Sequence, residues 1–178
     1  ASTGNITVNI MPNDLHELLE QAIGEYSDRF DACKLEIVTS IPESARSVMA
    51  DGRLLWRVFS NLFSNLVKYA QPETRVYINS VRTIDNNIMI SIKNVSREAL
   101  NISAEELTQR FVRGDESRHS EGSGLGLNIV ENLVHLQNGY FNIVIDGDLF
   151  RTNIILPAKP EEVPTQDSST ESNVFDKD

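Results

Sequence analysis

Residues 53–69 read RLLWRVFSNLFSNLVKY, a run in which apolar side chains recur at helical spacing. Asp51 stands just before this run and is a residue type that favours helix N-caps. Apolar residues occupy nearly every side of the predicted helix, namely Trp56, Val58, Phe59, Leu62, Phe63 and Leu66. A helix that is hydrophobic all round is normally buried. We therefore expect a mostly buried helix from about Arg53 to Tyr69.

Three polar side chains interrupt this apolar helix on one face. Asn61 and Asn65 are four residues apart and Lys68 follows three residues later, so all three project from the same side. Amide oxygens suit a hard cation such as Mg²⁺, and an ammonium suits phosphate. A structural interpretation stays open, in which the asparagines cap neighbouring loops and the lysine extends its stem to reach solvent.

A second motif, Gly122-Ser123-Gly124-Leu125-Gly126-Leu127, runs directly into a helical pattern at 128–137. Glycines at alternate positions allow close backbone approach to an anion, which the helix N-terminus then favours electrostatically. The pattern predicts phosphate binding, with a simple tight turn as the alternative. Residues 110–122, just before the helix, have little periodic apolar content and are predicted to form a mobile lid.

The remaining pattern alternates short strands with helices. Asn13 or Asp14 is expected to cap a helix, and Ser103 to Glu106 has the spacing of a capping box. Strands are predicted at 6–10, 35–38, 47–49, 75–81, 88–92, 140–145 and 152–156. The fold class is therefore α+β, a two-layer α/β sandwich. We expect a mixed, mostly antiparallel sheet of about five or more strands, covered on one face by about three helices.

Composition restricts the class of protein. With 178 residues, of which 40% are hydrophobic, the chain is long enough for one core. The single cysteine, Cys33, excludes an internal disulfide framework, and no apolar run is long enough to cross a bilayer. A net charge of -10 argues against non-specific nucleic-acid binding. Residues 158–178 carry six acids against two lysines and few large apolar groups, so we expect a folded domain at 1–157 and an acidic disordered tail at 158–178.

These motifs resemble those of one family, the ATP-binding catalytic domain of sensor histidine kinases, within the gyrase, heat-shock chaperone, histidine kinase and MutL superfamily. Residues 61–69 are similar to its N box, residues 110–115 (RFVRGD) to its F box and residues 122–127 to its second glycine box. Three motifs in the same order and spacing are more specific than any one of them. The resemblance extends from about Ile6 to Pro157.

The resemblance implies a Bergerat fold that holds ATP between the helices and the lid. Asn65 is then expected to coordinate Mg²⁺ with help from Asn61, and Lys68 and Tyr69 to contact phosphate or ribose. Arg113 is expected to reach the γ-phosphate, so that Arg113 and Lys68 are the catalytic candidates. The other nucleotide-binding candidates that it implies are Asn94, Phe111, Gly122, Ser123, Gly124, Leu125, Gly126 and Leu127.

The chain departs from the family at its first glycine box, usually Asp-x-Gly-x-Gly. Residues 94–98 (NVSRE) stand at this position, and both glycines are missing. Asn94 still offers an acceptor for the amino group of adenine, but an amide can also present its donor side, which weakens the selection for adenine. The last hairpin lacks the family's Gly-Thr-Thr-Phe run, so Thr152 receives no role.

None of the three histidines fits a phosphoacceptor. His16 lacks the proline expected five residues later, His119 lies in the predicted lid and His135 lies near a helix C-terminus. The chain also starts without methionine, so we expect an upstream histidine-bearing dimerisation domain.

The partners that follow are that dimerisation domain and a cognate response regulator. Neither nucleic acid nor membrane contact is expected of this fragment. The parent is expected to be a homodimer at the cell membrane with this domain in the cytoplasm. The hypothesis is thus a histidine protein kinase. The alternatives are a non-catalytic nucleotide-sensing or interaction module of the same fold and a stand-alone serine kinase of the anti-sigma type.

Overall fold

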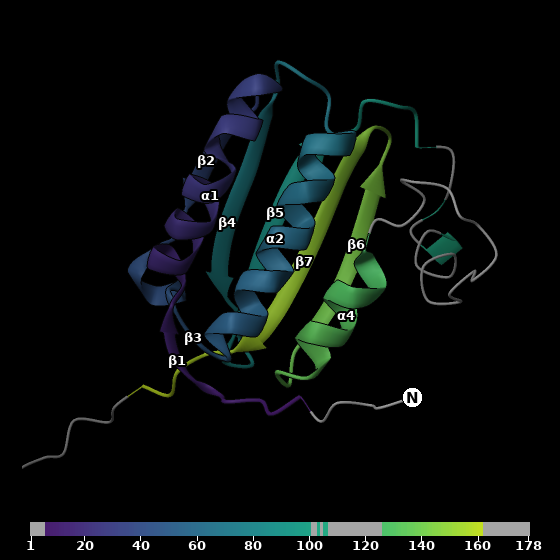
Figure 1. Cartoon of the computed structure of the whole chain (residues 1–178). Helices are drawn as coiled ribbons and strands as arrows, with labels where there is room; N and C mark the ends of the chain where they lie inside the picture. Colours follow the sequence, from purple (N-terminus) through teal and green to yellow (C-terminus); the bar gives the residue numbers. More distant parts are fainter. Residues whose placement is uncertain (1–5, 101–102, 104, 107–125, 162–178) are drawn as a thin grey trace, which may run out of the picture.

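The computed structural model describes residues 6–100, 103, 105–106 and 126–161. The elements of these residues form two layers, with the helices on one face of a sheet (Figure 1). In chain order they are β1 (Met11–Asp14), α1 (Leu15–Ala32), β2 (Glu36–Ser40), the 3₁₀ helix η1 (Glu43–Ala45), β3 (Ser47–Ala50), α2 (Gly52–Tyr69), β4 (Arg75–Arg82), β5 (Asn87–Val95), α4 (Leu127–His135), β6 (Tyr140–Asp146) and β7 (Leu149–Pro157).

The main sheet has five strands in the order β2-β4-β5-β7-β6. β2 pairs with β4 in parallel, and the other neighbouring pairs are antiparallel. β1 and β3 form a separate two-stranded antiparallel sheet. The predicted α+β class and the mixed, mostly antiparallel sheet are therefore confirmed.

The core lies between the sheet and the helices, with α2 in the middle of the helical layer (Figure 1). Every second residue of the central strands points into this core, and the buried apolar ones are Val76, Ile78, Ile88, Ile90, Ile92, Ile154 and Leu156. Phe63 of α2 meets Phe30 of α1 edge to face, with ring centroids 5.6 Å apart. On its other side, α2 packs against α4. Contact on three sides explains why the helix is apolar nearly all round.

The predicted caps of α1 and α2 are confirmed, and in the predicted capping box the Ser103 hydroxyl accepts a hydrogen bond from the Glu106 N–H at 3.1 Å. Asp14 accepts hydrogen bonds from the backbone N–H groups of His16 and Glu17 at the start of α1. Asp51 does the same for Arg53 and Leu54 at the start of α2. Each cap satisfies amides that have no partner within their own helix.

The strand expected at residues 6–10 is wrong. These residues belong to no strand, and Ile6 is 54% exposed. The strand lies instead at Met11–Asp14, where it pairs with β3 from Met11 opposite Ala50 to Asp14 opposite Ser47. Alternating hydrophobicity indicates a strand only where a partner strand is available, and here the partner aligns with the next four residues.

Backbone pairing continues beyond Pro157, the expected end of the domain. Ala158 is buried and forms an antiparallel bridge with Val48, and the Lys159 N–H donates to the Ser47 carbonyl at 3.0 Å. The predicted lid and residues 162–178 of the predicted tail lie outside the described residues. In the described part of the chain, no helix combines the length and apolarity needed to span a membrane.

Candidate functional site

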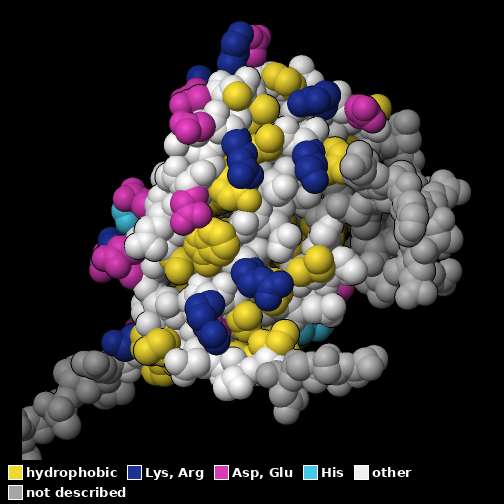
Figure 2. Space-filling model, in the orientation of Figure 1, with side chains coloured by type: hydrophobic (Ala, Val, Ile, Leu, Met, Phe, Trp, Pro, Cys, Tyr) yellow, Lys and Arg dark blue, Asp and Glu magenta, His cyan; other side chains and the backbone are white. Residues whose placement is uncertain are grey.

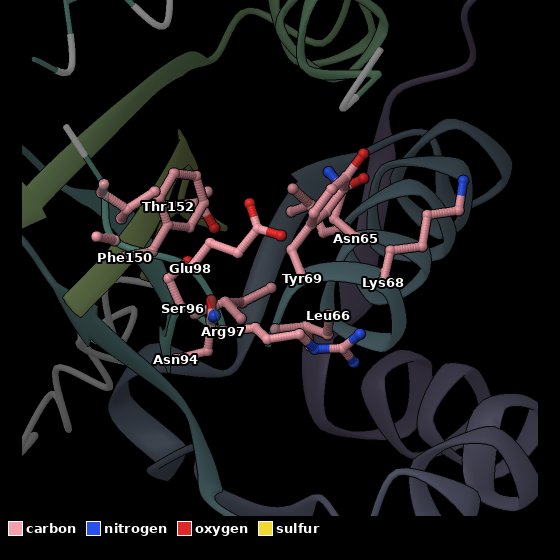
Figure 3. Close-up of a pocket in the computed structure, with 14 residues that line it drawn as sticks. Asn65, Leu66, Lys68, Tyr69, Asn94, Ser96, Arg97, Glu98, Phe150 and Thr152 are labelled. Carbon is pink, nitrogen blue, oxygen red and sulfur yellow. The ribbon is translucent and has the colours of Figure 1, made fainter. Parts of the chain in front are cut away.

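A cavity of about 400 Å³ opens between the C-terminal half of α2 and the strands β5 and β7. Side chains from both sides and from the segment after β5 line it (Figure 3). This volume is in the range of small-molecule sites. Four sequence-predicted residues lie together in its wall, namely Asn65, Lys68, Tyr69 and Asn94.

Part of the cavity lining is apolar. Leu62, Leu66, Ile92 and Phe150 form this part, together with two polar side chains that are themselves buried, Asn94 and Thr152. The strand register brings these residues together, because Thr152 stands opposite Ile92 and Phe150 opposite Asn94. The side-chain nitrogen of Asn94 donates to the Val95 carbonyl at 3.2 Å.

The other part of the lining is polar and charged. Asn65, Lys68 and Tyr69 come from the last turns of α2, and Arg97 and Glu98 from the segment after β5. Figure 3 shows Lys68 on the opposite side of the view from Asn94 and Thr152. The cavity lining thus combines apolar and charged side chains, which suits an amphipathic ligand.

The segment after β5 is held in place by backbone hydrogen bonds on both sides. The Arg97 N–H donates to the Tyr69 carbonyl at 2.8 Å, and the Ser96 N–H donates to the Asp148 carbonyl in the β6–β7 turn at 2.7 Å. This is the position of the family's first glycine box, and here Ser96, Arg97 and Glu98 place side chains in the cavity wall. Sequence reasoning identified the missing glycines but not this role.

Thr152 and Phe150 were also missed as lining residues. The hairpin of β6 and β7 was predicted correctly, but its pairing with β5 was not predicted. That pairing places Thr152 beside Ile92. That pairing joins strands far apart in the sequence, so the local pattern could not reveal it.

Asn61 lies outside the cavity lining, one turn before Asn65 on α2. Its side-chain nitrogen donates to the Arg57 carbonyl at 2.9 Å. Its Oδ1 would be 3.5 Å from a Cβ added to Gly126, which precedes α4 with a φ of +61°. Asn61 therefore lies beside the described end of the glycine stretch, where Leu127 is buried in the core. The positive φ accounts for a glycine at 126.

The other sequence-predicted residues, Phe111, Arg113 and 122–125, lie outside the described residues. In the described ranges, no cluster of three His, Cys, Asp or Glu side chains could hold a metal ion. A cation bound here would therefore rely on amide, phosphate and water oxygens, which is an arrangement that Mg²⁺ accepts.

Charged side chains are unevenly distributed over the face that the helices form, although the chain as a whole is acidic. Lys and Arg side chains gather over α2, whereas acidic ones lie over α1 (Figure 2). α2 itself contains Arg53, Arg57 and Lys68 and no acidic residue. A local positive field of this kind favours polyanions such as a triphosphate.

Comparison with known proteins defines the class. Residues 50–171 match the model of the family described as "Histidine kinase-, DNA gyrase B-, and HSP90-like ATPase", and the chain belongs to this family. Membership in this ATPase family supports a nucleotide-binding domain.

Relatives narrow the class to histidine kinases. The chain is 34% identical over 131 residues to the probable sensor protein PcoS of Escherichia coli. This match covers 71% of the chain and 28% of PcoS. It is 31% identical over 138 residues to the histidine-protein kinase BaeS of Escherichia coli strain K12, covering 76% of the chain and 29% of BaeS. The chain thus spans under a third of these relatives.

The fold is also that of a solved catalytic domain, from histidine kinase ThkA. The TM-score is 0.72 at 16% identity, and the match covers 84% of this chain and 96% of that domain.

Proposed function

We propose that this chain is the ATP-binding catalytic domain of a two-component sensor histidine kinase, and that it transfers the γ-phosphoryl of ATP to a histidine on an upstream dimerisation domain. The observation that carries the proposal is the composition of the cavity. A single helix supplies Asn65 and Lys68, while β5 and β7 supply the apolar Ile92 and Phe150 and two buried polar groups, Asn94 and Thr152.

This composition fits a nucleoside triphosphate. A purine is flat and largely apolar and suits the apolar side chains of β5 and β7, beside which Asn94 and Thr152 can meet its hydrogen-bonding edge. The triphosphate is a polyanion and suits the side of Lys68, whose ammonium is a compact point charge. ATP, once bound, supplies the phosphoryl group, and Mg²⁺ neutralises charge on its phosphates.

The roles of individual residues follow from this fit. We assign Asn65 as the amide ligand of Mg²⁺, and Lys68 and Tyr69 as contacts of the phosphates or ribose. Asn61 lies one turn earlier on the same side of α2, where it supports the turn into α4 through Gly126. Arg113 and the glycines at 122 and 124 keep their predicted roles at the γ-phosphate and the lid.

A direct test of binding is titration calorimetry with ATP and ADP in the presence and absence of Mg²⁺. Both nucleotides are expected to bind at or below millimolar concentration, and more tightly with Mg²⁺. Absence of heat at millimolar nucleotide would contradict the binding half of the proposal.

The parent's partners are further parts of the proposal. ThkA has been solved in complex with the response regulator TrrA, and that structure matches this chain with a TM-score of 0.68 at 16% identity. By analogy, we expect a response regulator to receive the phosphoryl group from the parent's histidine. We also place this domain in the cytoplasm, where ATP is available, with the parent at the cell membrane.

A non-catalytic nucleotide-sensing module is the second candidate, and a specific observation favours it. Ser96 and Glu98 bring side chains into the cavity wall where the family has glycines. Incubating the full-length parent with γ-labelled ATP separates the two. Acid-labile label on a histidine of the parent supports the kinase, whereas nucleotide binding without label supports the sensing module.

A further inference from the structure

A groove of about 280 Å³ lies between α1 and β2, at the opposite edge of the molecule from α4 (Figure 1). Leu19 and Ile23 from α1, Ile37 from β2 and Ile41 just after β2 form the apolar part of its lining. None of the residues that line the proposed nucleotide cavity lines this groove. The groove is therefore a separate apolar surface.

β2 is an edge strand, and its outer side has no partner strand in the described part of the chain. The Glu36 N–H points toward β4, where it donates to the Thr74 carbonyl at 3.1 Å. Because successive N–H groups of a strand point in opposite directions, those of Ile37 and Thr39 point to the open side. The side chains of the same two residues line the groove. Unpaired backbone groups and an apolar groove thus adjoin along β2, which is what an added strand requires.

Gly24 leaves the α1 wall of this groove open. It lies inside the helix, where glycine is destabilising relative to alanine. Its φ is not in the left-handed region, and a Cβ at this position would meet no atom within 4 Å. Neither the backbone conformation nor packing within the described residues therefore accounts for a glycine. Close approach of a second chain does account for it, because a side chain here would narrow the groove.

The rim of the groove on α1 is acidic. Glu20 lines the groove beside His16, and Glu20, Gly24 and Asp28 follow at four-residue spacing, so these three share one face of the helix. Acidic side chains gather over α1 in Figure 2. A cationic partner is therefore favoured over a second copy of this chain, whose own α1 would bring the same carboxylates to the β2 edge.

We propose that an extended segment of a partner protein docks here and pairs with the open side of β2 as a sixth strand of the five-stranded sheet. Its apolar side chains enter the groove, and its lysine or arginine side chains lie beside Glu20 and Asp28. Backbone pairing supplies affinity, and the alternate side chains supply specificity. The inference does not depend on what the other cavity binds.

The probe for this site is the synthetic peptide acetyl-Lys-Thr-Ile-Thr-Val-Thr-Lys-amide. In a strand it places lysine and apolar side chains on one face and threonine on the other. It is titrated into the isotope-labelled full chain and followed by NMR. We expect a dissociation constant at or below about 1 mM, with shifts around Gly24 and in residues 36–41. Hydrogen exchange of the Ile37 and Thr39 amides should slow on binding. Absence of these shifts at about 5 mM peptide overturns the inference.

Two altered peptides test the backbone and the charge separately. N-methylation of the central isoleucine and threonine removes a donor that faces β2 in either register, and should weaken binding at least about tenfold. Glutamate in place of both lysines should weaken binding at least about tenfold at low salt, and less at high salt. If either altered peptide binds as tightly as the probe, the inference is overturned.

The variant Gly24→Gln tests the approach along α1. Glutamine favours a helix more than glycine does, so the melting temperature should stay equal or rise. Its side chain narrows the groove, so probe binding should weaken at least about tenfold. Ala32→Gln, at the exposed end of α1 outside the groove lining, is the control and should bind the probe unchanged. Unchanged binding by Gly24→Gln overturns the inference.

Sedimentation of the chain without peptide tests the other occupant. A monomer at all concentrations is expected. A concentration-dependent dimer in which the Ile37 and Thr39 amides are protected from exchange would show that a second copy occupies the edge, and would overturn the choice of a cationic partner.

Discussion

Asp51 joins the start of α2 to two other parts of the chain. Its side chain is almost fully buried and accepts hydrogen bonds from the backbone N–H groups of Asn9, Arg53 and Leu54. Its own N–H donates to Gln137 Oε1 at 3.1 Å. The hydrogen bond and ion pair from the Arg53 guanidinium, followed by the backbone donors, lower the pKa of this carboxyl from 3.8 to about 2 against the opposing effect of burial.

Asp51 should therefore make stability depend on pH in the acid range. Because its pKa is lower in the folded state, its contribution is fully present above pH 3.8 and is lost as the pH falls toward 2. The free energy of unfolding should fall by about 2 kcal/mol from this group. Urea denaturation at pH 5 and pH 2.5 measures the loss, and Asp51→Asn, which can still cap the helix, should show a smaller one. If the unmodified chain and Asp51→Asn lose equal free energy of unfolding between these pH values, Asp51 is not the source of the pH dependence.

Single residues also show what sequence reasoning can establish about the site. Asn65, Lys68 and Asn94 lie in the wall of one cavity. Asn65 and Lys68 stand out in the sequence as polar residues in an apolar helix, whereas Asn94 was identified only by the resemblance to the family's first glycine box. Thr152 has no such signal. Threonine is an ordinary strand residue, and only its register opposite Ile92 places it in the cavity.

At the scale of elements, α2 presents its two asparagines to different neighbours. Asn65 faces the cavity, whereas Asn61, one turn earlier, lies against Gly126 at the start of α4. Helical periodicity could predict that both project from one side of the helix. It could not predict that α4 begins beside the first of them, because that depends on packing between segments far apart in the chain.

Alanine substitutions should separate these two roles. Asn65→Ala is expected to weaken Mg²⁺-dependent ATP binding by at least about tenfold, because an amide ligand of the ion is lost. Asn61→Ala should mainly lower the melting temperature by loosening the turn into α4, with a smaller effect on affinity. Calorimetry in Mg²⁺ and in EDTA, with thermal melts, measures both effects. Asn132→Ala on the exposed side of α4 is the control. Equal losses of affinity in the two α2 variants would refute this division.

The elements that were predicted best are those that nearby residues in the sequence specify. Both hairpins of the main sheet turn at residues with positive φ, Asn86 at 59° and Gly147 at 58°, and these residue types mark such turns in the sequence. β1 was misplaced because its position depends on a distant partner, β3. The segment after β5 was not predicted to line the cavity for the same reason, since the carbonyls of Tyr69 and Asp148 hold it.

Over the whole molecule, the end of β7 connects the two sheets. After Pro157 the chain passes from the main sheet to β3, where Ala158 bridges Val48. The Ala158 N–H donates to the Asn86 carbonyl at 3.1 Å, and the Lys159 N–H donates to Ser47. The Arg82 guanidinium then donates to the Lys159 carbonyl and forms an ion pair with Glu161 at 3.5 Å. The boundary at 157 remains a prediction that these contacts make testable.

Two truncations test where the folded unit ends. A chain that stops after Glu161 retains every contact just described, so its free energy of unfolding should match that of the full chain within about 0.5 kcal/mol. A chain that stops after Pro157 loses two backbone hydrogen bonds and a buried alanine, and should be less stable by about 1–3 kcal/mol, with a melting temperature several degrees lower. Urea denaturation followed by the fluorescence of Trp56, the single tryptophan, measures both. Equal stability of the two truncated chains would support the boundary at 157, whereas the expected difference moves it to at least Lys159.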